Sequence, residues 1–338
     1  MTTLVVADDK TVIRIDPASG EHLWSHLVAG TLRIRGMRST DSHVYAGSGT
    51  TFEKLDLETG SLVWTVEIVG GANGIGFDES GHVWVGSNQD NIVKLKDDDG
   101  TKIFTRKLPV EFVTGSNTLR AVAVLGNRIF VGTQNSNNVG EIDQEAGLVK
   151  VVNFGTNVVH ILPLGDSLIV GGVDKVAQYD LDFNLIAEKA IGQISGLGFR
   201  SKGVAWVLND GTDSMQAIRF PDLEVLEEIE GFGNSVGNVY DYAFGDGGLV
   251  AGGDVAGSEV RFYQSGELKW TSILPDDTLA GVHLIASIGP VAEEEIFQAT
   301  YASASAAPPK RTALVRPLDV QRSIDTDVAW LARNPKDW

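Results

Sequence analysis

The sequence predicts an all-β protein: a β-propeller of eight four-stranded blades, with the C-terminal strand closing the ring against the N-terminal blade. Three observations support this fold. A short apolar strand recurs along the 338 residues, a turn containing Asp and Gly follows several copies of it, and the 39 glycines far outnumber the 10 prolines. Abundant glycine with little proline is typical of tight turns between strands. A repeat of roughly 40 to 45 residues is the length of a four-stranded propeller blade.

The recurring strand is a run of apolar residues that ends in small ones. Its eight copies begin at Leu4, Val44, Val83, Ile129, Leu168, Val204, Leu249 and Ile296. We expect each copy to be the second strand of a blade, because another strand-like segment precedes all but the first. These expected innermost strands are residues 32–35, 74–77, 119–124, 158–162, 196–199, 239–244 and 282–287.

The first blade lacks an innermost strand, because the sequence reaches Leu4 almost at once. Residues 327–332 are strand-like and have no blade of their own, so we predict that they pair beside residues 4–7. Such pairing removes open sheet edges. Residues 300–311 are small and contain two prolines, and we expect a loop inserted in the eighth blade. That loop is either a surface excursion or a contact arm, and residues 1–338 are expected to form a single domain.

The second half of the repeat is a hairpin followed by tryptophan. Residues 15–24 and 55–64 both place Asp four residues before Gly, and Trp four residues after it. The Asp carboxylate can accept backbone N–H groups in the turn, and Gly can take the positive φ that the turn needs. We expect Trp24, Trp64 and Trp270 to be large apolar plates packed between adjacent blades.

This Asp-x-x-Thr/Ser-Gly-x-x-x-Trp pattern resembles the repeat of the quinoprotein-type (PQQ-like) eight-bladed propellers. The Trp is replaced near its expected place in four blades, by Phe104, Val151, Ile186 and Leu226. The resemblance implies enzymes with a vicinal Cys pair, a calcium site and a catalytic Asp, but this chain has no Cys and no segment that aligns with those residues. We therefore expect the family's fold without its dehydrogenase active site, and no cofactor.

The chain is strongly acidic, with a formal net charge of −18 and a pI near 4.7. Such a surface repels nucleic-acid phosphates and anionic lipids, so we expect neither partner. The N-terminal residues show neither a secretion signal nor an anchor, and no apolar stretch approaches the roughly 20 residues that span a bilayer. The expected location is a virion if the protein is viral, and the cytoplasm otherwise.

Metal sites and catalytic motifs are not predicted. Residues 97–100, Asp-Asp-Asp-Gly, resemble the start of a calcium loop, but their position in the repeat favours a hairpin turn. The six histidines are dispersed. His22 and His26 lie on one strand face but roughly 13 Å apart, too far to share a zinc ion. No nucleophile elbow or phosphate-binding loop occurs.

Ligands of propellers are expected on the central axis, where the innermost strands converge. The candidate ligand residues on or beside these strands are Arg33, Arg35, Arg120, His160, Tyr240, Asp241 and His283. Basic side chains predominate in this set although the chain as a whole is acidic. Either they line a polar channel without further purpose, or they form a pocket for anions or carboxylates.

Three functions remain open. The first is a non-catalytic structural or interaction module in a larger assembly, expected to be a tail or capsid accessory protein of a virion with protein, host-receptor or glycan partners. The second is a carbohydrate- or anion-binding propeller, a lyase or hydrolase that uses the axial Arg, His and Tyr residues. The third is a scaffold resembling the propeller lipoprotein of outer-membrane assembly, although this chain lacks a Cys for the lipid.

Overall fold

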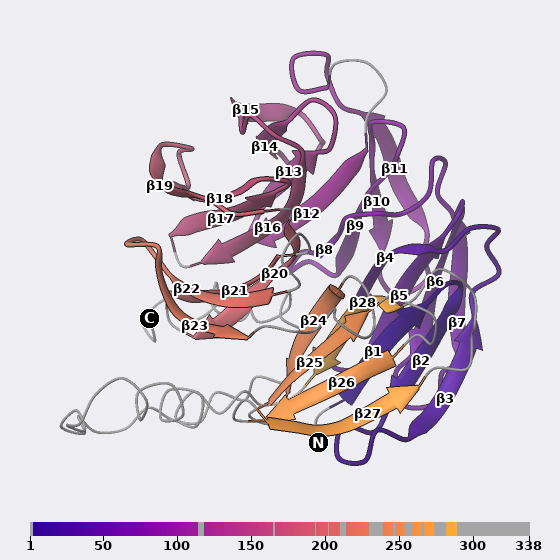
Figure 1. Ribbon diagram of the computed structural model, residues 1–338. Helices are drawn as coiled ribbons and strands as arrows, with labels where there is room; N and C mark the ends of the chain where they lie inside the picture. Colours follow the sequence, from indigo (N-terminus) through magenta and orange to yellow (C-terminus); the bar gives the residue numbers. More distant parts are fainter. Residues whose placement is uncertain are drawn as a thin grey trace, which may run out of the picture.

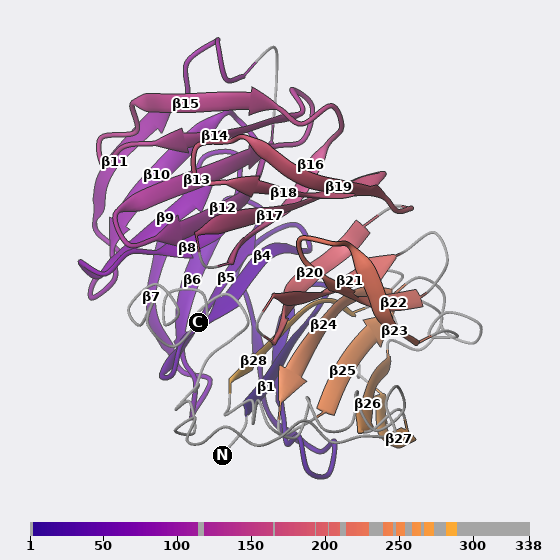
Figure 2. The ribbon, with the colours of Figure 1, turned by 90° about the vertical axis from the view of Figure 1, so that its left-hand side faces the viewer.

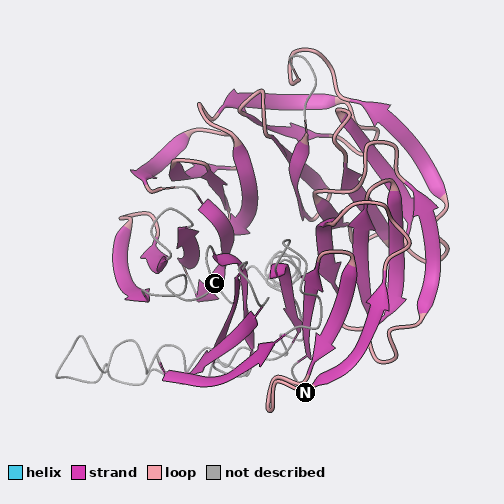
Figure 3. Cartoon of the chain, turned by 45° about the vertical axis from the view of Figure 1, so that its right-hand side comes forward, coloured by secondary structure: helices cyan, strands magenta, loops and turns pink. Residues whose placement is uncertain are grey.

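The computed structural model describes residues 3–113, 118–164, 166–192, 194–201, 203–209, 214–229, 239–245, 248–253, 259–264, 267–273 and 282–288. Within these ranges the secondary structure is β-strand and turn, with no helix (Figure 3). No helix that could cross a membrane therefore occurs in them. The predicted strand beginning at Ile296, the loop 300–311 and the closing strand 327–332 lie outside the described residues.

Seven antiparallel sheets of four strands follow one another along the described chain (Figure 1). The first three sheets, each from innermost to outermost strand, are β28 (Val282–Ile288), β1 (Thr3–Asp8), β2 (Thr11–Ile15) and β3 (His22–Leu27); β4 (Ile34–Ser39), β5 (His43–Ser48), β6 (Thr51–Asp56) and β7 (Leu62–Glu67); β8 (Ile75–Phe77), β9 (His82–Gly86), β10 (Asn91–Lys96) and β11 (Lys102–Lys107). The next two are β12 (Leu119–Leu125), β13 (Arg128–Thr133), β14 (Asn138–Ile142) and β15 (Leu148–Asn153); β16 (Val158–Leu164), β17 (Ser167–Gly172), β18 (Lys175–Asp180) and β19 (Leu185–Ala190). The last two are β20 (Ile194–Ser201), β21 (Val204–Asn209), β22 (Ser214–Arg219) and β23 (Glu224–Ile229); β24 (Val239–Gly245), β25 (Gly248–Gly253), β26 (Glu259–Gln264) and β27 (Glu267–Ile273).

The predicted strands are confirmed wherever the structure describes them. All seven second strands from β1 to β25 lie at the expected positions, and six of the innermost strands do so as well; β4 begins at Ile34, two residues later than the expected 32–35, and runs to Ser39. The innermost strands contact one another in succession, from β4 through β8, β12, β16, β20 and β24 to β28, and β28 also contacts β4. The sheets are therefore the blades of a propeller.

The prediction of eight blades is not confirmed, because the described residues form seven sheets. Residues 282–287 were expected to open an eighth blade, but β28 pairs with β1, with Leu4 opposite Ser287 and Val6 opposite Ile285. Figures 1 and 2 both show β28 beside β1 and near β24. The physical reason is that β1 needs an antiparallel partner on its inner side; since β1 pairs with β2 and β28, the place predicted for residues 327–332 beside residues 4–7 is taken by β28.

Adjacent blades approach closely because the second strand ends in glycine. A Cβ added at Gly47 would lie 2.5 Å from the Cβ of Ala72, and one added at Gly132 would lie 2.4 Å from Cγ1 of Val158. Both neighbours belong to the beginning of the next blade. The recurring small residue in the sequence repeat is thus the place where successive blades meet.

The hairpins and two of the tryptophans behave as predicted. Gly60 has a φ of +71°, and the Asp56 carboxylate accepts the Thr59 amide at 2.8 Å. Hydrogen bonds from the Thr59 hydroxyl and amide hold the pKa of Asp56 below its usual value. Trp24 donates its indole N–H to the Leu57 carbonyl of the next blade at 3.0 Å, and its ring lies against Gly60.

Trp64 repeats this contact one blade further along. Its indole N–H donates to the Asp97 carbonyl at 2.9 Å, and its ring lies against Gly100. Gly100 takes a φ of +71° in the hairpin between β10 and β11, so residues 97–100 form the predicted turn. Trp270 lies on β27, and its side chain is outside the described part of the structure.

Candidate functional site

The innermost strands begin at one end of the propeller, which we call the axial mouth. A Cβ at Gly36 on β4 would lie 2.3 Å from the Asn73 carbonyl, and one at Gly74 would lie 2.7 Å from the Val122 amide of β12. The Arg38 side chain also reaches from β4 to the Val122 carbonyl at 3.5 Å, across the short β8. We define the axial mouth as residues 33–36, 72–74, 119–121, 158–160, 194–196, 239–241 and 282–284.

A β-bulge occurs at the same position in six of the seven sheets. On β4, Ile34 pairs with Ser48 and Gly36 with Gly47, so that Arg35 is left without a partner in the ladder. The residues left out in the same way on β12, β16, β20, β24 and β28 are Arg120, Val159, Ser195, Tyr240 and His283. Bulges bend a strand and re-aim a side chain, and they are frequent beside functional sites.

The remaining sheet has the corresponding residue just before its innermost strand. Asn73 donates its amide to the Gly86 carbonyl at 2.9 Å, and Gly86 donates its own amide to Gly74 at 2.8 Å. Asn73 therefore takes the place that Arg35 occupies one blade earlier, and its side chain donates to Asn88 at 3.0 Å. Each of the seven sheets contributes one such residue to the axial mouth.

The bulge turns two arginines towards solvent between buried neighbours. Ile34 and Gly36 are buried while Arg35 is exposed, and Leu119 and Ala121 flank the exposed Arg120 in the same way. The bulge therefore places charge at the axial mouth without charging the interior of the blade.

Three arginines are close enough to act on one another. The pKa of Arg120 is lowered, first by desolvation from the protein around it and then by the positive charges of Arg33 and Arg35. The Arg120 side chain is thus open to solvent and yet enclosed by protein, as expected of a side chain at the mouth of a ring. Arg33, Arg35 and Arg120, which we call the arginine triad, come together from two blades that a third one separates.

The arginine triad has no ion-pair partner among the described residues, whereas other arginines have one. These other pairs are Arg14 with Glu58 at 2.8 Å, Arg128 with Glu141 at 2.6 Å and Arg219 with Asp222 at 2.6 Å. Three like charges without a carboxylate are unusual in a chain of net charge −18. Such an arrangement fits an anionic ligand better than a purely structural role.

The other predicted ligand residues share the axial mouth by position. His160 is half-buried on β16, one residue beyond the bulge at Val159. Tyr240 and Asp241 lie at the bulge of β24 and His283 at that of β28, and their side chains are outside the described part. The structure thus brings the arginine triad together, and for the remaining candidates it gives the position on the strand.

Three mouth residues were not predicted from the sequence: Asn73, Val159 and Ser195. They were missed because only residues with charged or titratable side chains were considered as candidates. A local pattern finds Asn73 and Ser195, in which a buried apolar residue is followed by any residue and then by a small one; Val159 does not fit it, because His160 follows. It is visible as Ile34-Arg35-Gly36, Ala72-Asn73-Gly74, Leu119-Arg120-Ala121 and Ile194-Ser195-Gly196.

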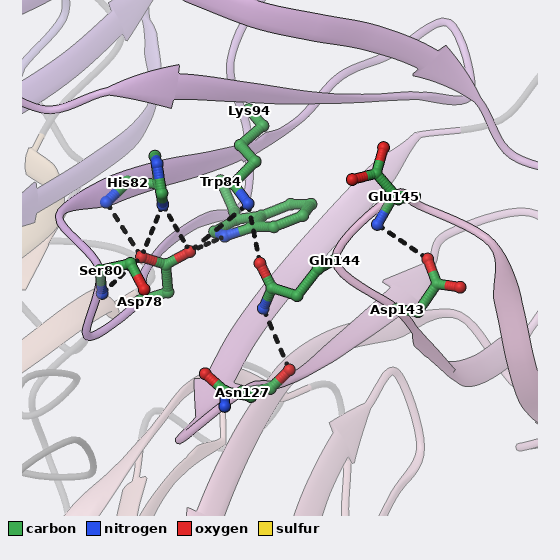
Figure 4. Close-up of polar contacts among 9 residues, drawn as sticks. All are labelled: Asp78, Ser80, His82, Trp84, Lys94, Asn127, Asp143, Gln144 and Glu145. Atoms are coloured by element: carbon green, nitrogen blue, oxygen red, sulfur yellow. Dashed lines mark hydrogen bonds and ion pairs between the residues drawn. The ribbon is translucent and has the colours of Figure 1, made fainter.

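A second polar cluster surrounds the buried carboxylate of Asp78, in the turn between β8 and β9 (Figure 4). One oxygen accepts the amides of Ser80 at 2.9 Å and His82 at 3.0 Å, and the other accepts the indole N–H of Trp84 at 2.9 Å. The imidazole Nδ1 of His82 also lies 3.0 Å from the carboxylate. Both oxygens therefore accept hydrogen bonds from the turn and from β9, which argues against an acid–base pair.

The same cluster connects the third sheet to the fourth. Lys94 Nζ lies 3.9 Å from the Asp78 carboxylate and donates to Gln144 Oε1 at 2.7 Å, and Gln144 donates onward to the Asn127 carbonyl at 3.1 Å (Figure 4). Lys94 also lies over the Trp84 ring, 4.7 Å from its centre. The cluster is thus a polar joint between two blades.

Substituting Asp78→Asn is expected to destabilise the protein by about 1–2 kcal/mol, because the amide replaces one acceptor with a donor in a buried position. The loss is measured by urea unfolding. Asp98→Asn, in an exposed turn, removes the same charge and serves as the control. Equal effects of the two substitutions would contradict the importance of this joint.

The histidines form no metal site in the described part of the chain, where no group of three His, Asp or Glu side chains is placed to hold an ion. His26 and His22 both lie on the outermost strand β3, as predicted. His26 contacts Glu53 of the second sheet at 2.8 Å, and His22 contacts Ser272 of the seventh at 3.2 Å. The two rings therefore join the first blade to its two neighbours.

Comparison with known proteins gives one family and one fold. The model of the family described as outer membrane protein assembly factor BamB matches residues 48–270. Among 1573 similar chains in solved structures is the crystal structure of BamB from Moraxella catarrhalis, with a TM-score of 0.52, 12% identity, and coverage of 84% of this chain and 92% of that one. No curated protein matches the sequence. At this identity the structural likeness establishes the fold only, and a fold so widely shared does not by itself assign a function.

Proposed function

This chain belongs to the family of the outer membrane protein assembly factor BamB, and from this premise we propose that it is a non-catalytic propeller that binds other proteins in a larger assembly. The family carries the PQQ-like repeat that the Asp, Gly and Trp pattern indicated. The name of the family describes an assembly factor, which supports a role in binding rather than in catalysis.

The observation that carries the proposal is a set of exposed apolar side chains on the loops that connect one blade to the next. Leu32, Val69 and Val110 lie on three consecutive loops and are 51%, 51% and 76% exposed. These loops end where the innermost strands begin, so the three side chains lie on the same end of the propeller as the axial mouth. Apolar side chains that recur on one face are typical of protein-binding surfaces.

The non-catalytic part of the proposal is supported by how the carboxylate–histidine pairs are used. The Asp78 carboxylate accepts hydrogen bonds from Ser80, in its own turn, and from Trp84 on β9. Glu53 accepts the Ala29 amide at 3.1 Å and faces His26 at 2.8 Å, where it fastens the second blade to the first. In the part of the chain that the structure describes, the pairs Asp78–His82 and Glu53–His26 therefore hold a turn and two blades in place.

The more specific form of the proposal places the propeller in a virion, as a tail or capsid accessory protein, with a host surface receptor or a glycan as its partner. This form rests on the sequence expectation alone. Neither the family nor the fold bears on it, and the location of the protein likewise stays a prediction.

The proposal is tested by purifying the tagged full-length chain from its own source and reconstituting each co-purified protein with it from purified components. We expect one partner to form a complex of defined stoichiometry in light scattering. A chain that stays monomeric with every purified candidate would overturn the proposal.

The alternative function, a carbohydrate- or anion-binding propeller that acts as a lyase or hydrolase, is favoured by the arginine triad. It requires turnover of an anionic polysaccharide, and turnover must fall when His160 is changed to Ala. Under the proposed function we expect no turnover in a panel of such substrates, measured by the release of reducing ends or unsaturated products.

A further inference from the structure

We propose that the axial mouth binds an acidic segment of a partner protein, and that Arg35 and Arg120 hold its carboxylates. This inference rests on the proposed function, because it takes the partner to be a protein, and it adds the place and the chemistry of the contact. It is carried by the repeated bulge, the unpaired charges and the apolar side chains beside them.

The first step is the geometry of the bulge. A single bulge is a local irregularity, but the same residue is left out of the ladder in six sheets, and Asn73 takes its place in the remaining one. The backbone therefore presents one residue from every blade at one end of the ring. In two blades that residue is an exposed arginine, namely Arg35 and Arg120.

The second step is the charge. The arginine triad is unpaired within the described residues, and its members repel one another, as the lowered pKa of Arg120 indicates. A bound carboxylate relieves this repulsion and gains paired hydrogen bonds from the planar guanidinium groups. Arginine is suited to this contact because its fork of donors matches the two oxygens of a carboxylate.

The third step compares the acidic residues at the two ends of the propeller. The turns between the third and fourth strands of each blade lie at the end opposite the axial mouth, because the strands are antiparallel. They carry acidic residues in six blades, namely Asp16, Asp56, residues 97–99, Asp143, Asp180 and Asp222. The turns between second and third strands, at the mouth end, also carry Asp9, Asp90 and Asp174, so the charge that attracts an acidic segment to the axial mouth is the local one of the arginine triad.

The fourth step explains why the ligand is a protein segment and not a free anion. Leu32 directly precedes Arg33, and the loop that carries it contacts Gly49, which in turn touches the next loop at Gly71. Leu32 therefore lies beside the arginine triad and Val69 on the neighbouring loop, and both are about half exposed. Apolar side chains next to unpaired cations suit a segment that carries both acidic and apolar residues.

The test uses the full-length chain and a fluorescently labelled peptide of glutamate and leucine, with binding followed by anisotropy at low ionic strength. We expect the double variant Arg35→Gln/Arg120→Gln to weaken binding at least about tenfold, since hydrogen bonds to charged groups contribute that much. Arg106→Gln is the matched control, because Arg106 is an exposed arginine on the outermost strand β11. Equal loss in the double variant and in the control would overturn the proposal.

Two further arms of the experiment test a free anion as the ligand and a structural role for the arginines. Leu32→Ser/Val69→Ser is expected to weaken peptide binding several-fold and to leave the displacement of the peptide by inorganic sulfate unchanged. If this variant leaves peptide binding unchanged, the site binds free anions, and the proposal of a protein segment as the ligand is wrong. The double arginine variant is expected to unfold at the same or a higher urea concentration than the wild type, because it removes repulsion and no partner. A marked loss of stability would show that the triad is structural and would overturn the assignment.

The outcome is also distinguishable from a failure of the proposed function. If the natural partner forms its complex equally well with Arg35→Gln/Arg120→Gln, the axial mouth is not the contact, although the interaction role stands. If no partner forms a complex with the wild-type chain, the proposed interaction role is wrong. The inference about the axial mouth is then wrong as well, even if the test peptide binds.

Discussion

Replacing Trp64 by Ala is expected to lower the free energy of unfolding by about 3–5 kcal/mol, the usual cost of removing a large buried aromatic side chain. Trp64 is 8% exposed and lies 5.8 Å from Phe52 and 6.1 Å from Tyr45, measured between ring centres. It also donates to the Asp97 carbonyl of the next blade. The substitution therefore removes apolar contacts and an inter-blade hydrogen bond together.

Chemical unfolding in urea measures this loss of free energy. Two further variants separate the contribution of the inter-blade hydrogen bond from that of the apolar contacts. Trp64→Phe keeps most of the apolar plate and loses the hydrogen bond, so it should cost about 1 kcal/mol. Leu62→Ala lies on the same strand, but Leu62 is 48% exposed and should have little effect. If Trp64→Ala were as mild as Leu62→Ala, the tryptophan would not be holding the blades together.

Gly86→Ala is expected to destabilise the protein by about 3 kcal/mol, at the upper end of what overpacking costs. The new Cβ would lie 2.6 Å from the Leu119 carbonyl oxygen and 2.8 Å from Leu119 Cβ, where the next blade begins. Backbone on β12 would have to move away from β9, because no flexible side chain can yield at that contact.

The matched control is Gly171→Ala, at the same repeat position in another blade. Its Cβ would meet Ile194 Cγ2 at 3.4 Å, an ordinary van der Waals contact, and should be tolerated. Neither glycine has a positive φ, so the difference between the two variants isolates the contact between blades. Comparable unfolding midpoints for both variants would contradict the role of this contact.

The sequence predicted those features whose causes are local. The period of the apolar strands located the second strands from β1 to β25 and the innermost strands, because strand patterning and turn chemistry act over a few residues. The contacts of Trp24 and Trp64 were predicted for the same reason, since the hairpin glycine that each one covers has a fixed place in the repeat. Arg35 and Arg120 were chosen from their position on innermost strands.

Features that depend on distant partners were not predictable in the same way. An innermost strand such as β28 has the same pattern whether it opens an eighth blade or completes the first, and only its pairing with β1 decides between them. The shift in register at the axial mouth is likewise a property of two strands. The polar joint from Asp78 through Lys94 to Gln144 crosses between sheets, and no repeat in the sequence marks it.

The pairing of β28 with β1 also bears on how the chain is made. During synthesis β1 to β3 emerge before the other described strands, but their sheet lacks its inner strand until residues 282–288 have also left the ribosome. Until then β1 presents an unpaired edge, which other chains can join. The first blade to be translated is thus among the last to be completed, so nascent or truncated chains are the form of this protein most exposed to aggregation.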